Sequence, residues 1–159
     1  MLSEKENRGY NVAILIGMIL SSDYISRLSK ENKIDYSEFK EKEHRAGDLA
    51  KWVADFIIAK GYKAFAQSDK NLIYGIYEET TKTTPLQHKK VAILSGLGWI
   101  GKNNLLVTKE YGSALCMCTV LTNALLPTEN PSIIKPKCSE CTICKDIWPT
   151  SGIHGCIWD

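Results

Sequence analysis

The longest apolar run in the chain lies within residues 10–20 and predicts a core strand. A short continuous run of this kind, here Val12 to Leu20, is typical of a strand buried on both faces. Gly17 inside the run predicts a bulge or a close approach of another segment. Nine residues are under half of the roughly 20 that a membrane helix needs, so no membrane span is expected.

Apolar residues then recur at helical spacing and predict one long helix from Ser37 to Lys60, ended by Gly61. Ser37 is the expected N-cap, and glycine is common just beyond a helix because it adopts left-handed backbone angles without strain. We expect the apolar stripe of this helix to pack in the core, without binding a cofactor. The stripe consists of Leu49, Trp52, Val53, Phe56 and Ile57.

Shorter elements follow. Residues 62–67 predict a strand, and Thr84 with Pro85 predicts the start of a second helix that Gly96 ends. We expect His44 and His88 to be solvated surface residues.

Residues 105–107 and 113–121 predict two strands joined by a turn, which suggests a hairpin. Alternation along the second strand places Cys116 and Cys118 on one face, and both are expected in the core. Three prolines make residues 123–137 an extended connector. Strands mixed with helices indicate an α+β or α/β sandwich.

Composition fits one globular domain with a small appendage, because 44% of the 159 residues are hydrophobic and 24% are charged. A net charge of +2, with lysines and glutamates mixed along the chain, is too mild to imply a nucleic-acid surface. Glu4 and Glu6 cancel the positive flank that a secretory signal needs. A cytoplasmic location is expected, where thiols stay reduced.

Cys138, Cys141 and Cys144 have the spacing of a ferredoxin-type run, in which thiolates wrap an iron-sulfur cluster. Trp148 stands where the last cysteine of such a run would ligate a second cluster. The sequence also ends at Asp159 before any second run. We therefore expect one cluster.

The fourth ligand of that cluster stays open. Cys156 is the nearest candidate, and Cys116 or Cys118 would serve only if the fold brought their strand alongside. An open iron, or a thiolate from a partner chain, is a further alternative. The three arm cysteines with His154 or Cys156 would equally satisfy zinc, whereas disulfides are less favoured at this spacing.

A glycine loop, GLGWIGKNNLL, precedes the two strands of the expected hairpin. Gly96, Gly98 and Gly101 permit close approach of a ligand, and Lys102 adds a cation, which suits a phosphate or a large cofactor. The loop is not a dinucleotide fingerprint, because it follows a helix and precedes a strand. A turn that packs Trp99 into the core explains the glycines equally well.

Three stretches together resemble the epoxyqueuosine reductase family and its relatives, the reductive dehalogenases. They are GLGWIGKNNLL (96–106), EYGSALCMCTVLTNALLP (110–127) and CSECTICKDIWPTSGI (138–153). The family consists of cobalamin-dependent reductases with two [4Fe-4S] clusters on a core resembling flavin nitroreductases. The resemblance implies an α+β fold: a nitroreductase-like α/β sandwich core over residues 1–126, with a short ferredoxin-like cysteine arm over residues 127–159.

The resemblance also implies site residues. The arm cysteines Cys138, Cys141 and Cys144 would bind the cluster nearest the cofactor. The residues expected near the cofactor cavity are Gly96, Gly98, Trp99, Gly101, Lys102 and Asn103.

One departure from the family concerns proton transfer. Where its tRNA-modifying members have a catalytic aspartate, this chain has Lys82, whose ordinary pKa near 10.4 suits an acid poorly near neutrality. We therefore expect a redox protein that passes electrons from one cluster to a corrinoid or flavin (FMN), on a substrate other than epoxyqueuosine. The alternatives are a non-catalytic cobalamin-handling or electron-carrier module, and a zinc-stabilised domain. The implied partners are an electron-donor protein or a small-molecule reductant, and a homodimer stays open.

Overall fold

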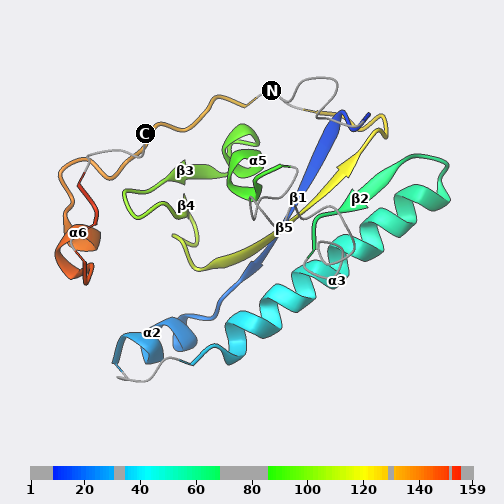
Figure 1. Cartoon of the computed structure of the whole chain (residues 1–159). Helices are drawn as coiled ribbons and strands as arrows, with labels where there is room; N and C mark the ends of the chain where they lie inside the picture. Colours follow the sequence, from blue (N-terminus) through cyan, green and yellow to red (C-terminus); the bar gives the residue numbers. More distant parts are fainter. Residues whose placement is uncertain (1–8, 31–34, 69–85, 129–130, 151, 155–159) are drawn as a thin grey trace. The chain divides into compact units, whose positions relative to one another are not determined.

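The computed structural model describes residues 9–30, 35–68, 86–128, 131–150 and 152–154 (Figure 1). The chain divides into two compact units. The first joins the chain up to Val91 with Ala114–Thr128, and the second joins Ala92–Ser113 with the segment from Glu129 onward. The predicted boundary between residues 126 and 127 stays a prediction.

The first unit contains a three-stranded antiparallel sheet in the order β1-β5-β2. Its strands are β1 (Val12–Ile19), β5 (Leu115–Thr122) and β2 (Ala64–Ala66). The central strand β5 is the buried one. The prediction that the first strand is covered on both faces was wrong, because β1 lies at the sheet edge and most of its side chains are only half-buried.

Gly17 does not form a bulge. The register of β1 and β5 runs without interruption, and Gly17 pairs with Met117. A Cβ added to Gly17 would lie 3.8 Å from Leu115 Cδ1, an ordinary contact distance. The expected bulge was therefore wrong, and the strand tolerates glycine here without needing it.

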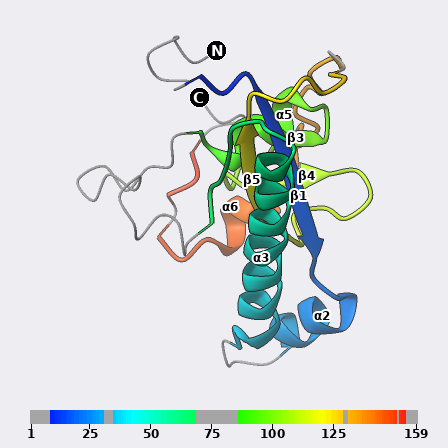
Figure 2. The ribbon, with the colours of Figure 1, turned by 90° about the vertical axis from the view of Figure 1, so that its right-hand side faces the viewer.

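The long helix α3 (Ser37–Ala59) covers one face of this sheet (Figure 2). Ala46, Ala50 and Ala54 recur every four residues, face the sheet and are almost completely buried. Small side chains let the helix lie close to the strands. The core that forms there contains Ala46, Ala50, Ala54, Ile57, Ala66, Cys118, Val120 and Ala124.

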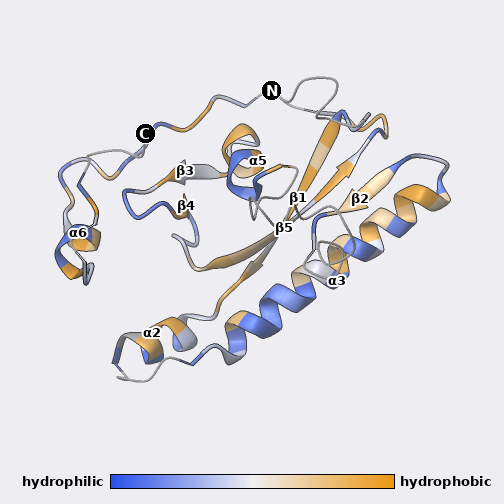
Figure 3. Ribbon diagram, in the orientation of Figure 1, coloured by the Kyte–Doolittle hydropathy of each residue, from blue (hydrophilic) through white to orange (hydrophobic). Residues whose placement is uncertain are grey.

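The predicted core stripe of α3 was therefore wrong in its large members. Trp52 is 64% exposed, and Phe56 and Leu49 are exposed as well. The rings of Trp52 and Phe56 stack on each other at 5.9 Å, and the Lys60 ammonium lies 5.5 Å from the Phe56 ring. Apolar spacing alone did not distinguish the alanine face of α3 from its aromatic face. Figure 3 shows hydrophobic and hydrophilic positions alternating along this helix.

Glycines follow the ends of the two predicted helices, as expected from the sequence. Gly61, with φ +87°, follows α3, and Gly96, with φ +66°, follows α5 (His88–Leu94). After each helix, the N–H of the glycine and the N–H of the next residue donate to carbonyls of the last turn. This is the Schellman arrangement. The predicted start of α5 at Thr84 and Pro85 lies outside the described residues.

A short helix, α2 (Ser22–Lys30), was not predicted. The Ser21 hydroxyl caps it by accepting the Tyr24 N–H at 3.1 Å. Its start and stop signals were present in the sequence, with Asp23 in the first turn and Arg27 in the last. The helix is mostly polar, so the spacing of apolar residues does not reveal it.

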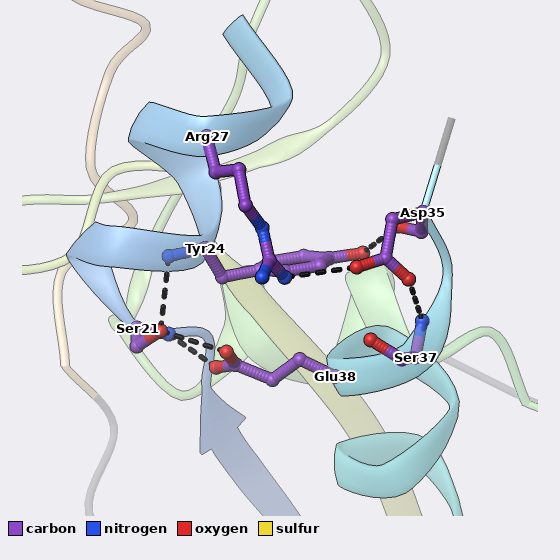
Figure 4. Close-up of polar contacts among 6 residues, drawn as sticks. All are labelled: Ser21, Tyr24, Arg27, Asp35, Ser37 and Glu38. Atoms are coloured by element: carbon purple, nitrogen blue, oxygen red, sulfur yellow. Dashed lines mark hydrogen bonds and ion pairs between the residues drawn. The ribbon is translucent and has the colours of Figure 1, made fainter. Parts of the chain in front are cut away.

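The contact between α2 and α3 is polar (Figure 4). The Glu38 carboxylate accepts hydrogen bonds from both the backbone N–H and the hydroxyl of Ser21. Asp35 accepts the Ser37 N–H at 2.8 Å and pairs with Arg27 at 2.8 Å. Ser37 is the first residue of α3 and makes no side-chain cap, so its predicted N-cap role was wrong. The carboxylate of Asp35 satisfies that N–H instead.

The second unit contains a two-stranded antiparallel sheet of β3 (Gly98–Ile100) and β4 (Leu106–Thr108). The predicted hairpin of residues 105–107 with 113–121 was therefore wrong, because β4 pairs with β3 whereas β5 pairs with β1 and β2. The turn between Thr108 and Gly112 does form, with two backbone hydrogen bonds between these residues. The sequence predicted the turn correctly, but it did not predict which strands pair with each other.

The two histidine predictions had different outcomes. His44 is exposed, as expected. His88 is half-buried, and its Nδ1 lies 2.7 Å from the hydroxyl of the fully buried Thr119. Its expected solvation was wrong, because the first turn of α5 packs this ring against β5.

The buried positions of Cys116 and Cys118 confirm the core prediction, at 5% and 4% exposure. Burial raises the pKa of the Cys116 thiol, and the nearby Glu43 charge raises it further. The mixed α/β class with small sheets is also confirmed. Among the helices that the structure describes, none is long and apolar enough to cross a bilayer.

Ala50→Leu should lower the free energy of unfolding by about 2 to 3 kcal/mol, because no space remains between α3 and the sheet at this position. Trp52→Ala should cost only about 1 kcal/mol, since it removes an exposed ring and one stacking partner. Urea unfolding of both variants measures the difference. The reverse order of the two losses would place the large side chains in the core and contradict this packing.

The polar contact between α2 and α3 predicts a dependence on pH. Hydrogen bonds from Ser21 lower the pKa of Glu38 below its ordinary value of 4.5, and hydrogen bonds from Ser37 lower the pKa of Asp35. Because both folded-state pKa values are depressed, their stabilisation is complete above the unfolded values and is lost as the pH falls through the folded ones.

Glu38→Gln should therefore lose less stability than the wild-type chain between about pH 5 and pH 3. Ser21→Ala removes one of the two hydrogen-bond donors and should give an intermediate slope. Denaturant unfolding at a series of pH values measures these slopes. Parallel curves for the wild type and Glu38→Gln would contradict the assignment.

Candidate functional site

The glycine loop and the cysteine arm both belong to the second unit. At Gly98 the loop enters β3 and lies directly against β4. A Cβ added there would lie 2.1 Å from the Val107 carbonyl oxygen, a distance that no real side chain permits. The two strands therefore approach each other at a separation that only glycine allows.

Gly101 forms the turn that follows β3. Its N–H donates to the Leu105 carbonyl at 2.8 Å, and its own carbonyl accepts the Asn104 N–H at 2.9 Å. A Cβ on Gly101 would lie 2.9 Å from Asn103 Oδ1, which itself accepts the Leu105 N–H. Asn103 thus closes the turn of its own loop.

Gly96 has both a left-handed backbone and a close neighbour. A Cβ there would lie 2.8 Å from the Cβ of Pro131. Contacts within the second unit consequently explain why each of the three positions is glycine. Of the two interpretations of the loop, a cofactor cradle and a structural turn, the turn accounts for the glycines without any ligand.

Trp99 supplies the loop atom that fits contact with a bound group. Its indole Nε1 is buried and has no hydrogen-bond partner among the residues that the structure describes. A buried donor left without an acceptor costs roughly 1 to 3 kcal/mol. The Lys137 ammonium lies 5.8 Å from the centre of the same ring. A ligand with an acceptor group at this indole would remove that cost.

The cysteine arm forms a turn followed by a short helix, α6 (Ile143–Ile147). The Cys141 N–H donates to the Cys138 carbonyl at 2.9 Å, and Ser139 between them has φ +42°, a left-handed backbone that is strained for serine. Cys144 lies in the first turn of α6. The backbone therefore curls between the first two cysteines and becomes helical at the third.

The donor chemistry of the arm fits a metal group. Cys138, Cys141 and Cys144 are thiols outside any disulfide, and each is at least partly accessible. Thiolates at this spacing suit iron-sulfur clusters and zinc alike. Within the described ranges, however, no three His, Cys, Asp or Glu side chains gather at one point. The structure thus places Cys138 and Cys141 at one turn and Cys144 in the helix that follows, without converging the three side chains on one point.

The candidates for a fourth ligand lie in different places. Cys156 lies outside the described residues. His154 is exposed near the end of the arm. Cys116 and Cys118 lie in the core of the first unit, where burial keeps the Cys116 thiol protonated at neutral pH. Lys82, the residue at the expected proton-donor position, also lies outside the described ranges.

Lys102 connects the glycine loop to the cysteine arm, which sequence reasoning missed. Its Nζ donates to the Ser139 carbonyl at 2.7 Å and to the Cys141 carbonyl at 2.8 Å. The structure bonds this ammonium to the arm backbone, and the place near a cofactor cavity that the resemblance implies stays a prediction. The partners are 37 and 39 residues away in sequence, so no local pattern could have identified them.

Comparison with known proteins gives a consistent set of relatives. The chain is 44% identical over 71 residues to an epoxyqueuosine reductase of Atelocyanobacterium thalassa, an alignment that covers 45% of this chain and 23% of the relative. It is 31% identical over 118 residues to an epoxyqueuosine reductase of Lactococcus garvieae, covering 71% of this chain and 33% of the relative. The chain therefore has epoxyqueuosine reductases as homologues.

A solved structure agrees with these relatives. The chain superimposes with a TM-score of 0.50 and 27% identity on epoxyqueuosine reductase crystallised with an epoxyqueuosine-modified tRNA-Tyr stem loop, over 67% of this chain and 26% of that one. No family model matches the chain. The chain spans at most a third of the length of the curated relatives named above, so their complete activity does not transfer to it directly.

Gly98→Ala should lower the free energy of unfolding by about 3 kcal/mol or more, because the added methyl group must displace the backbone of β4. Gly112→Ala is the matched control. It has φ +56° but open space around the added Cβ, so it should cost about 1 kcal/mol from backbone strain alone. Chemical denaturation compares the two variants, and equal losses would show that the close approach to Val107 does not constrain the hairpin.

Proposed function

We propose that this chain is an iron-sulfur redox protein related to epoxyqueuosine reductases, in which Cys138, Cys141 and Cys144 hold a [4Fe-4S] cluster. The observation that carries the proposal is the arm itself: three accessible thiols at ferredoxin spacing on a curled backbone. The homology to epoxyqueuosine reductases supports an oxidoreductase role. The proposed fourth ligand is Cys156.

When bound, the cluster would supply one-electron transfer between an external reductant and a second cofactor. The residues of the chain provide its surroundings. The arm cysteines supply thiolate ligands, and the turn between Cys138 and Cys141 directs the backbone around them. An electron-donor protein or a small-molecule reductant would act as the partner.

The second cofactor in this proposal is a corrinoid or a flavin (FMN) held by a nitroreductase-like core. The indole N–H of Trp99, which has no hydrogen-bond partner among the described residues, supports a bound group at the glycine loop. Gly96, Gly98 and Gly101 are needed for contacts within the chain and add no support of their own. A homodimer would be consistent with the exposed aromatic face of α3, although no contact in the structure identifies its partner.

The substrate is proposed to differ from that of the relatives. One relative was crystallised with an epoxyqueuosine-modified tRNA stem loop. In this chain Lys82 takes the proton-donor position of that family, and an ammonium of ordinary pKa near 10.4 gives up its proton poorly near neutrality. A net charge of +2 also gives little attraction to RNA.

Anaerobic reconstitution with iron and sulfide tests the proposal. The wild-type chain should take up about four irons per chain and develop broad visible absorbance, as expected for a [4Fe-4S] cluster. Cys141→Ser should lose most of the iron and the colour. Cys118→Ala is the control, because this thiol lies in the core of the first unit and should leave the iron content unchanged.

Other outcomes have defined meanings. A colourless chain that binds one zinc, and that loses it in Cys141→Ser, would replace the redox proposal by a zinc-stabilised domain. A cluster that forms but reduces no electron acceptor would indicate a non-catalytic carrier module. Iron content that is independent of Cys141 would contradict the arm as the cluster site.

A further inference from the structure

We infer that Lys102 is a positioning residue for the cluster: it locks the cysteine arm in its curled form and makes the bound cluster easier to reduce. The inference rests on the proposed function, because it concerns how the arm holds an iron-sulfur group. It assigns to Lys102 a role directed at the arm backbone, in place of direct contact with a cofactor in the glycine loop.

The geometry of the carbonyls carries the first step. Ser139 and Cys141 are two residues apart, yet both of their carbonyl oxygens accept from the same nitrogen, at 2.7 and 2.8 Å. In an extended backbone, the carbonyls of residues i and i+2 point in the same direction and lie several ångströms apart. Convergence on one ammonium therefore requires the curl that Ser139 provides with its left-handed φ of +42°. Lys102 offsets the strain that this conformation costs.

The second step concerns the amides on the other side of the same peptide units. In a trans peptide the N–H points opposite to the carbonyl. With both carbonyls held by Lys102, the N–H groups of Glu140 and Thr142 point away from the lysine. Hydrogen bonds from such amides to cluster and cysteine sulfurs are one of the means by which proteins set cluster potentials. Lys102 thus orients donors that a cluster would use.

The third step is the anchor of the lysine itself. Lys102 follows Gly101 in the turn closed by the Gly101-to-Leu105 hydrogen bond, and Asn103 fixes the next residues. The side chain is half-buried. A rigid turn that presents the ammonium loses little further freedom when the arm binds, which makes the two hydrogen bonds more effective.

The charge of Lys102 adds an electrostatic effect. Reduction adds a negative charge to the cluster, and a fixed cation beside the Cys141 carbonyl stabilises that charge. The same cation reduces the repulsion among the three thiolates. Removing it should lower the reduction potential and loosen the arm, so one substitution should change two independent measurements.

The experiment compares reconstituted wild-type chain with Lys102→Met, which keeps an unbranched side chain that is one atom shorter and removes both the charge and the donors. The rate of iron loss to a chelator should rise roughly tenfold, the factor expected for losing about 1.4 kcal/mol of partly exposed charge-assisted hydrogen bonding. The midpoint potential of the cluster, measured by redox titration with electron paramagnetic resonance, should become more negative. Lys102→Arg keeps the charge and two donors and should recover most of both properties.

Two matched controls separate the effect of the two Lys102 hydrogen bonds from the effect of its charge. Lys109→Met removes an exposed lysine in the turn after β4 and should change neither measurement. Lys145→Met removes an exposed charge next to Cys144 and should shift the potential without accelerating iron loss. Unfolding curves of the variants before reconstitution establish that each chain is folded.

The outcomes distinguish this inference from the function on which it rests. A wild-type chain that takes up no cluster overturns both. A wild-type chain with a normal cluster, together with a Lys102→Met variant of unchanged chelation rate and unchanged potential, overturns the role of Lys102 alone. Iron loss accelerated equally in Lys145→Met would also overturn it, because charge alone would then explain the effect.

Discussion

The contact of Gly98 with the Val107 carbonyl oxygen is the constraint on which the second unit depends. It brings β3 and β4 together at a separation closed to any side chain, and the turn between them is fixed by Gly101 and Asn103. Lys102 extends from that turn to the cysteine arm. A tight backbone approach is thereby connected, through one ammonium, to the backbone of the cysteine arm. The hairpin of β3 and β4 thus supports the backbone that carries Cys138 and Cys141.

Sequence reasoning succeeded where one residue type has one dominant physical consequence. Gly61 and Gly96 end their helices because a left-handed residue is required there. Cys116 and Cys118 are buried because alternation places them toward the core of a central strand. The turn from Thr108 to Gly112 forms as expected. In each of these cases local backbone geometry decides the outcome, and the sequence records local geometry directly.

It failed where several partners were available. The aromatic stripe and the alanine stripe of α3 have the same helical period, and close packing against a sheet favours the small side chains. In sequence, β4 lies between β3 and β5 and could have paired with either strand. It pairs with β3, and the glycine at position 98 permits the close approach of these two strands. The carbonyls that accept hydrogen bonds from Lys102 are 37 and 39 residues away in sequence. Such choices depend on contacts between distant segments, which spacing does not encode.

The five cysteines that the structure describes have two kinds of surroundings, which give the same thiol group two different roles. In β5 the Cys116 thiol is buried near Glu43, its pKa is raised, and it therefore remains a neutral core group. In the arm, Cys138 and Cys141 lie at a turn and Cys144 in the helix after it, and the three thiols are at least partly accessible. The Lys102 ammonium donates to the carbonyls of Ser139 and Cys141. Accessible thiols of this kind can serve as metal ligands. The two thiols of β5 therefore contribute to packing, whereas the three thiols of the arm are accessible to a metal.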